Sequence, residues 1–373
     1  MTAVGFVAAD IEGRIIPAHN SVLQPIFDLL SRSGFDCKWG QYSEPWGTIS
    51  GVDRNSVSCW VTCEPGMPSN QFIDRTFFHP HGLHPTESAY VMARAPNEEY
   101  RPWLGYLSPG SYWSGYINST YTERGDALHA GRLPVTGWAK MDAAFEPNVK
   151  EKTIQAHGLD LPYSKTVLYA PTGNWDWASS FDKSIKTILT IFEGLAYNLI
   201  VKTGNYAMSF QEYGTLLDYL TKGPKHIRGI HYDANVVPLY TLADAVITDG
   251  SSVAWEAIAL DKPTIQLNNM IDAVTSLVPG ILDCENCPYG AYDPNSKPPL
   301  EIRALFKQYP KCRFCGGVEK TGLEGLRETI IRNVENPNEH ADIRHEWAKK
   351  VNSPCDGHVA ERCVAEIRRI AGI

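Results

Sequence analysis

His81 is the residue in the first half of the chain that is best suited to acid–base chemistry. It follows the short apolar segment 76–78 and stands directly before a glycine. Loops at the carboxyl ends of strands form the sites of α/β proteins, and histidine titrates near neutral pH. We therefore expect His81 to act as a general base. A loop histidine held by backbone hydrogen bonds is the alternative.

Other polar side chains near the start of the chain are candidates for the same role. Asp10 and His19 flank the loop between the first predicted strand and helix, and a turn-capping role is equally open for Asp10. His79 and His84 join His81 in an HxHxxH pattern. This spacing permits metal binding, but three loop histidines without a carboxylate in the motif are a weak metal signal.

A phosphate-binding loop is the most informative feature of the second half, which contains the stretch ADAVITDGSSVAWEAIALDKPTIQL. Asp249 follows a buried strand, and a helix begins after Ser252. The N–H groups of a helix N-terminus bind anions, Gly250 permits a close backbone approach, and Ser251 and Ser252 add hydroxyl donors. Glu256, one turn into the helix, has the chemistry to accept both ribose hydroxyls. A serine helix cap with a solvated glutamate is the alternative.

Three further residues are expected to line the donor site. Lys202 ends the predicted strand 198–202 and is suited to pair with a donor phosphate; a solvated surface lysine is the alternative. Thr172 and Gly173 follow another predicted strand of the same half. All three therefore belong to the carboxyl ends of strands, where α/β proteins bind their ligands.

Two CxxC pairs have the spacing of zinc knuckles and lie in a long polar insertion. They consist of Cys284 with Cys287 and of Cys312 with Cys315. Four thiolates can close a tetrahedral structural site, which leaves no open position for catalysis. We therefore predict structural zinc and no catalytic cofactor, with free thiols or redox pairs as the alternatives.

Short apolar segments alternate with helical patterns, which is typical of parallel α/β sheets. The predicted strands of the first half cover residues 4–9, 58–62, 76–78 and 104–107, and those of the second half cover 165–170, 198–202, 245–248 and 264–267. The predicted helices cover residues 21–31, 183–193, 210–220, 253–260, 323–334 and 360–370. Two doubly wound, Rossmann-like domains that face a central cleft form the GT-B architecture.

The expected boundaries follow from this alternation. Residues 1–148 form an acceptor-side domain, and residues 160–345 form a nucleotide-donor domain with a Cys-rich insertion at about 279–320. The segment 350–373 is expected to be a helix that returns toward the first domain.

Composition and charge exclude several classes of protein. The chain has 373 residues, of which 43% are hydrophobic and 20% charged, an ordinary globular balance. A formal net charge of −8 argues against a broad nucleic-acid surface. No segment approaches the roughly 18 apolar residues that a membrane span needs, and the first ten residues lack the basic region of a signal peptide. We therefore expect a cytoplasmic protein that touches a membrane, if at all, through its acceptor.

Several short motifs together resemble one known family. Residues 243–265 resemble the pattern ADxxITDYSSxxxExxxxxKPxI, with Gly250 in place of its Tyr, and His81-Gly82 matches HG. Residues 136–142 resemble TGxxRxD, with Lys140 in place of its Arg. Residues 168–172 match a strand that ends in APT, and residues 356–362 match DGxxxxR. These motifs, in this order, resemble those of the CDP-glycerol glycerophosphotransferase family, which builds teichoic-acid and capsule-like polymers.

The resemblance implies a GT-B transferase that moves a group from a nucleotide-activated donor to a polymer, lipid-linked or other hydroxyl acceptor, with His81 as the catalytic histidine. The family has a histidine after the strand that here ends in Lys202, where this chain has Thr203-Gly204-Asn205. A UDP-linked sugar is therefore an alternative to CDP-glycerol as the donor. A UDP-sugar 2-epimerase, a nucleotide-binding module without activity, and sugar transfer to a modified nucleic acid are alternative functions.

Overall fold

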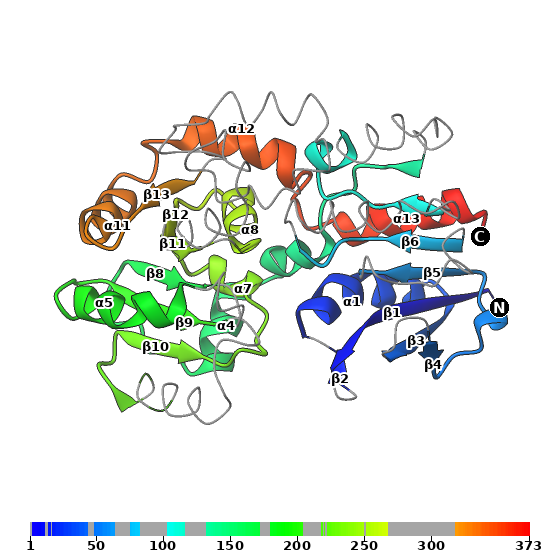
Figure 1. The fold of residues 1–373 in the computed structure, drawn as a ribbon, viewed down its shortest axis with the longest axis horizontal. Helices are drawn as coiled ribbons and strands as arrows, with labels where there is room; N and C mark the ends of the chain where they lie inside the picture. The colour runs from blue at the N-terminus through cyan, green and yellow to red at the C-terminus, as the bar shows by residue number, and fades with distance from the viewer. Residues whose placement is uncertain are drawn as a thin grey trace, which may run out of the picture. The chain divides into compact units, whose positions relative to one another are not determined.

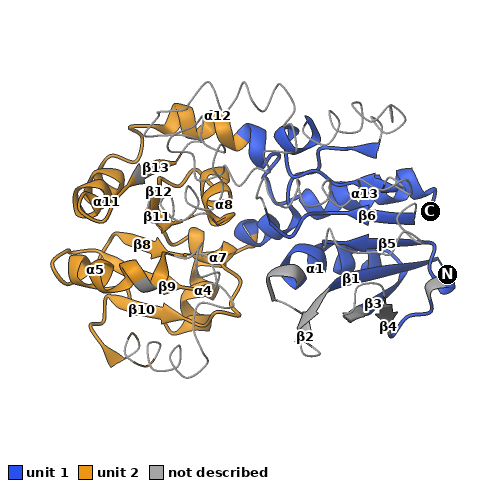
Figure 2. Cartoon of the chain, in the orientation of Figure 1, with its two compact units in different colours: residues 1–145, 298–302, 349–373 blue, residues 146–297, 303–348 orange. Residues whose placement is uncertain are grey.

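The computed structural model divides into two compact units, each with its own sheet (Figure 2). Unit 1 comprises residues 1–145, 298–302 and 349–373, and unit 2 comprises residues 146–297 and 303–348. The structure describes residues 2–11, 14–15, 17–43, 48–63, 75–82, 103–115, 132–171, 180–203, 218, 220, 222–249, 251–267 and 318–373.

The described part of unit 1 contains a seven-stranded sheet with the order β4-β3-β1-β5-β6-β7, in which β2 pairs with β1 (Figure 1). The strands are β1 (Ala3–Ile11), β2 (Arg14–Ile15), β3 (Asp36–Ser43), β4 (Thr48–Ser50), β5 (Cys59–Thr62), β6 (Thr76–Phe78) and β7 (Gly105–Tyr106). β2 and β4 are antiparallel to their partners, and the other five strands run parallel. After β1, the chain adds β3 and β4 on one side of it and then β5, β6 and β7 on the other, so the strand order reverses between β1 and β5.

Helix α1 (Pro17–Arg32) covers β1 and β3 with one apolar face. It buries Val22, Leu23, Ile26 and Leu30, whose spacing is that of one face of an α-helix. The same helix packs against η4 (Ala139–Phe145) and α13 (Val359–Ala371), so the last helix of the chain is part of unit 1.

The described part of unit 2 contains a six-stranded sheet with the order β10-β9-β8-β11-β12-β13, and all its pairings are parallel. The strands are β8 (Thr166–Tyr169), β9 (Asn198–Lys202), β10 (Ile227–Ile230), β11 (Ala245–Thr248), β12 (Thr264–Leu267) and β13 (Glu319–Thr321). This is the 3-2-1-4-5-6 order of a Rossmann sheet, and it reverses between β8 and β11.

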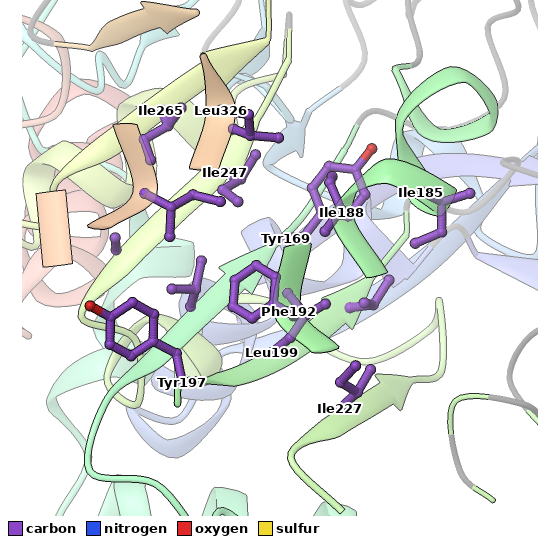
Figure 3. Close-up of a cluster of buried hydrophobic side chains, with 14 of the residues drawn as sticks. Tyr169, Ile185, Ile188, Phe192, Tyr197, Leu199, Ile227, Ile247, Ile265 and Leu326 are labelled. Atoms are coloured by element: carbon purple, nitrogen blue, oxygen red, sulfur yellow. The ribbon is translucent and has the colours of Figure 1, made fainter. Parts of the chain in front are cut away.

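Helices cover both faces of this sheet (Figure 1). The helices are α4 (Val149–His157), α5 (Phe181–Glu193), α7 (Val237–Tyr240), α8 (Val253–Ala259), α11 (Leu326–Glu335) and α12 (Ala341–Val351). A large apolar cluster joins α5 and α11 to alternate residues of the strands (Figure 3). It includes Ile188 of α5, Leu199 of β9 and Ile247 of β11. α8 packs on β11 and β12, and every residue of β8 and β11 is buried. Burial on both faces explains why these strands are continuous apolar runs.

The expected α/β architecture with two parallel, doubly wound sheets is confirmed. The predicted strands correspond to β1, β5 to β9, β11 and β12. Strands β2, β3, β4, β10 and β13 are additional, and most of the predicted helix 210–220 lies outside the described residues.

Candidate active site

The carboxyl ends of β8 and β11 lie side by side at the point where the strand order of unit 2 reverses. The backbone N–H of Ala170 donates to the carbonyl of Ile247 at 2.9 Å, and the hydroxyl of Thr248 donates to the carbonyl of Ala170 at 2.8 Å. Ligands of open parallel sheets bind outside the carboxyl ends of the strands at such a reversal. Of the predicted donor-site residues that follow these strands, Thr172, Gly173 and Gly250 lie outside the described residues.

Asp249 anchors the loop that follows β11. Its carboxylate oxygen Oδ2 accepts hydrogen bonds from the backbone N–H of Ser180 at 2.8 Å and from its hydroxyl at 2.9 Å. Ser180 precedes α5, so the negative charge lies at a helix N-terminus, where it is stabilised. The amide of Gln266 also donates to the Asp249 carbonyl at 2.8 Å. Asp249 thus holds the loop against two neighbouring elements, while its direct contact with a donor stays a prediction.

The two serines of the loop are half-buried at the start of α8. The hydroxyl of Ser251 accepts the N–H of Val253 at 3.3 Å, which is the local turn contact expected of a serine near a helix start. Ser252 occupies the N-cap position, and its side chain makes no capping hydrogen bond. The helix-cap alternative therefore applies in part to Ser251, while the described residues show no capping bond from the Ser252 side chain.

Glu256 is buried, which excludes the expectation of a solvated side chain. It is 1% exposed, and its Oε2 accepts a hydrogen bond from the hydroxyl of Tyr240 at 2.8 Å. Burial, together with the nearby Glu256 charge, raises the pKa of Tyr240 well above its usual value. The phenol therefore stays protonated and remains a donor to the carboxylate. No sequence motif indicates this partner, because Tyr240 precedes β11 along the chain and Glu256 follows it.

The carboxyl end of β9 adds a lysine and a buried hydroxyl. Lys202 is half-buried as the last residue of the strand. Thr203 follows it, and its buried Oγ1 has no hydrogen-bond partner within the part of the chain that the structure describes. Buried polar atoms of proteins are nearly always hydrogen-bonded, so an unsatisfied hydroxyl at this edge suits a ligand or a water molecule. In the sequence, Thr203 is marked only as part of the segment Thr203-Gly204-Asn205, in which the resembled family has a histidine.

His81 lies at the corresponding edge of unit 1, beside the ends of β5 and β6. Its ring Nδ1 contacts the carbonyl of Cys63, the residue after β5, at 3.0 Å, and its backbone N–H donates to the same carbonyl at 3.3 Å. A carbonyl only accepts, so Nδ1 carries the proton and Nε2 has the lone pair of a base. The backbone contacts of the alternative are thus present, and they set the tautomer that a general base requires.

His79 has a structural role in unit 1. Its Nδ1 donates to the carbonyl of Leu107 at 2.8 Å, and its Nε2 accepts the N–H of Ala139 at 3.1 Å. Burial lowers the pKa of His79 to about 4, so the ring is neutral near pH 7. Because both nitrogens bind the protein, His79 is not a metal ligand, and the HxHxxH metal alternative loses its first histidine. His84 lies outside the described residues.

The other candidate residues are placed only in part. Asp10 belongs to β1 and His19 to α1, and their side chains lie outside the described part of the chain. The cysteines predicted to bind zinc also lie outside it: Cys284, Cys287, Cys312 and Cys315. Among the residues that the structure describes, no group of His, Cys, Asp and Glu side chains is arranged to hold a metal ion.

Two of the recognised motifs bind each other. Asp142 ends the motif at residues 136–142 and accepts the N–H groups of Val359 at 3.0 Å and Ala360 at 2.8 Å, at the start of α13. Arg362 forms hydrogen bonds with both carboxylate oxygens of Asp356 at 2.7 and 3.0 Å, and its Nε donates to a backbone carbonyl of the first motif at 2.8 Å. These contacts attach the C-terminal helix to the rest of unit 1.

Comparison with solved structures gives matches over nearly the whole chain. The wall teichoic acid polymerase TagF, in a variant soaked with CDPG, matches with a TM-score of 0.64 at 14% identity, over 99% of this chain and 88% of that chain. Staphylococcus aureus MnaA with UDP matches at 0.56 and 11% identity, over 99% and 96% of the two chains. The Methanocaldococcus jannaschii UDP-GlcNAc 2-epimerase in complex with UDP-GlcNAc and UDP matches at 0.54 and 12% identity, over 98% and 99%.

These matches establish the GT-B fold that the sequence predicted, and at such low identity they establish the fold alone. No protein-family model matches the chain, and the search of curated proteins gives no match. Among the described residues, no helix is both long and apolar enough to cross a membrane.

Proposed function

We propose that this chain is a transferase that moves a glycosyl or glycerophosphoryl group from a CDP- or UDP-linked donor to an acceptor hydroxyl. The observation that carries the proposal is the reversal of strand order between β8 and β11, directly beside the loop Asp249–Ser252. Nucleotides bind to Rossmann sheets at this reversal, with their phosphates at the following helix N-terminus. The likeness to enzymes crystallised with CDPG and with UDP supports the same choice.

Each part of the donor has a partner with suitable chemistry in unit 2. The diphosphate binds to the backbone N–H groups of Ser251 and Ser252, and the ribose diol donates to Glu256. Lys202 and the unsatisfied hydroxyl of Thr203 add a positive charge and a donor at the neighbouring strand end. Negative charge builds up on the leaving nucleotide, which is the monophosphate in glycerophosphoryl transfer and the diphosphate in glycosyl transfer, so fixed donors at these positions would lower the barrier.

His81 supplies the base in this proposal. Its Nε2 has the lone pair, because the proton of the ring lies on Nδ1 toward Cys63. The acceptor hydroxyl transfers its proton to Nε2 as its oxygen attacks the donor, and the nucleotide leaves with the electrons of the broken bond. The family resemblance implies the same role for this histidine.

A binding experiment on the full chain tests the donor site. Isothermal titration with CDP, UDP and GDP should identify one nucleotide that binds, and that nucleotide should raise the melting temperature. Glu256→Gln should weaken its binding by roughly tenfold or more, as expected when hydrogen bonds to a charged group are lost. Glu335→Gln is the matched control, because Glu335 also accepts a tyrosine hydroxyl but lies at the end of α11. Unchanged binding in Glu256→Gln would remove Glu256 from the site.

A UDP-sugar 2-epimerase is the second candidate. It is favoured by the absence of the family's histidine after β9, where this chain has Thr203-Gly204-Asn205. An epimerase needs no acceptor, so incubation with UDP-GlcNAc alone separates the two functions. A new sugar epimer in the NMR spectrum would support the epimerase, whereas transfer that depends on an added hydroxyl compound would support the transferase.

A further inference from the structure

A buried tyrosine–carboxylate pair lies beside the proposed donor loop. Tyr240 ends the short helix α7, and Glu256 lies in α8, on the other side of β11 along the chain. The two side chains are 0% and 1% exposed, and the hydroxyl of Tyr240 is 2.8 Å from Oε2 of Glu256. No sequence motif includes Tyr240, and the proposed function does not assign it a role.

This contact fixes the direction of the Glu256 carboxylate. A buried carboxylate is stable only when hydrogen bonds replace its lost water, and the Tyr240 hydroxyl supplies one of them. The side chain of glutamate otherwise rotates about three bonds, so a single fixed donor removes much of that freedom. A carboxylate has about four acceptor positions, so this bond is compatible with two further bonds from a ribose diol.

We propose that Tyr240 is a positioning residue that orients Glu256 toward ribose and thereby sets a preference for ribonucleotide over 2′-deoxyribonucleotide donors. The inference rests on the proposed function, because it takes Glu256 as the ribose-binding residue. A carboxylate held in its binding orientation loses less conformational freedom when the nucleotide binds. The preference therefore depends on the Tyr240 hydroxyl, although that hydroxyl does not touch the ligand.

The test compares the affinity of the full chain for a nucleoside diphosphate and for its 2′-deoxy form, by titration of CDP against dCDP and UDP against dUDP. The wild-type chain should bind the ribose form roughly tenfold or more tightly. In Tyr240→Phe this ratio should fall by roughly threefold or more, because the ribose form loses affinity through both hydroxyls and the deoxy form only through its 3′-hydroxyl. A merely structural role would weaken both forms equally, and that result would overturn the inference.

Tyr197→Phe is the matched control. Tyr197 donates to Oε1 of Glu335 at 2.5 Å and directly precedes β9 (Figure 3). It therefore lies at the amino ends of the parallel strands, whereas the proposed donor loop follows their carboxyl ends. Its removal should leave the ribose preference unchanged. The double variant Tyr240→Phe/Glu256→Gln should show the same ratio as Glu256→Gln alone, since Tyr240 acts through Glu256. A further fall in the double variant would contradict this route.

The possible failures can be told apart. If the wild-type chain binds no nucleoside diphosphate, the proposed function is wrong. If it binds the ribose and deoxy forms equally, the nucleotide site survives but the roles of Glu256 and Tyr240 do not. A melting curve of Tyr240→Phe establishes that the variant is folded, and retained binding of the deoxy form provides a second check on its site.

Discussion

Replacement of Asp142 by asparagine tests how the C-terminal helix is held in unit 1. Each carboxylate oxygen of Asp142 accepts one backbone N–H, from Val359 at 3.0 Å and from Ala360 at 2.8 Å. These are N–H groups of the first turn of α13, which have no partner within the helix. Asparagine retains one acceptor oxygen but turns an amide donor toward the second N–H, so one bond is lost.

The size of the effect follows from these contacts. Loss of a side chain that caps a helix costs about 0.5–2 kcal/mol, and hydrogen bonds to charged groups contribute about 1.5–3 kcal/mol. Burial raises the pKa of Asp142, and the bonds from Ala360 and Val359 counteract that rise in part, so desolvation offsets some of the gain. We expect a loss of about 2 kcal/mol, which lowers the melting temperature of unit 1 by about 4–8 °C.

Differential scanning calorimetry of the full chain measures this change. Asp53→Asn is the control, because Asp53 also accepts a backbone N–H near a helical turn, from Asn55 at 3.1 Å, but is exposed. Its effect should stay below about 0.5 kcal/mol. If Asp142→Asn melts like the wild-type chain, the hydrogen bonds from Asp142 to the start of α13 do not stabilise unit 1.

Three further predictions concern acid–base groups and metal. His79 has a folded pKa of about 4, below the usual value of 6.5, so its neutral form is favoured on folding. The contribution of His79 to the free energy of unfolding should therefore be fully present above pH 6.5 and decrease as the pH drops toward 4, by about 2 kcal/mol at pH 5. Urea titrations at pH 7 and pH 5 measure this decrease, and His79→Gln should show a smaller difference between the two pH values. His81→Ala should reduce turnover by roughly 10²–10⁴-fold with unchanged nucleotide affinity, and an equal loss of affinity would contradict a base role. Purified protein should contain one zinc ion per chain, and Cys284→Ser or Cys312→Ser should lose it; zinc-free wild-type protein would rule out the structural site.

The strands that could be predicted from the sequence are those buried on both faces. Every residue of β8 and β11 is buried, and both are uninterrupted apolar runs. β10 was missed because it lies at the edge of its sheet and contains Arg228 and Gly229, which are only half-buried. β3 was missed for a similar reason, since its described side chains are mostly half-buried and include Asp36 and Lys38.

The candidate site was predictable where it depends on short sequence patterns. The turn after β11 and the histidine after β6 follow from local order along the chain, and the structure has both at carboxyl ends of strands. The contacts between distant residues were not predictable. Tyr240 with Glu256, and Asp142 with the start of α13, pair across intervening elements, and only the folded arrangement of the sheets brings them together.

A crystal structure of the full chain with bound CDP or UDP would locate the nucleotide. The two phosphate groups should accept hydrogen bonds from the backbone around Ser251 and Ser252, with both ribose hydroxyls on Glu256. A nucleotide bound away from the carboxyl ends of β8 and β11, with Ser251 and Ser252 not in contact with it, would show that unit 2 does not hold its donor at this loop.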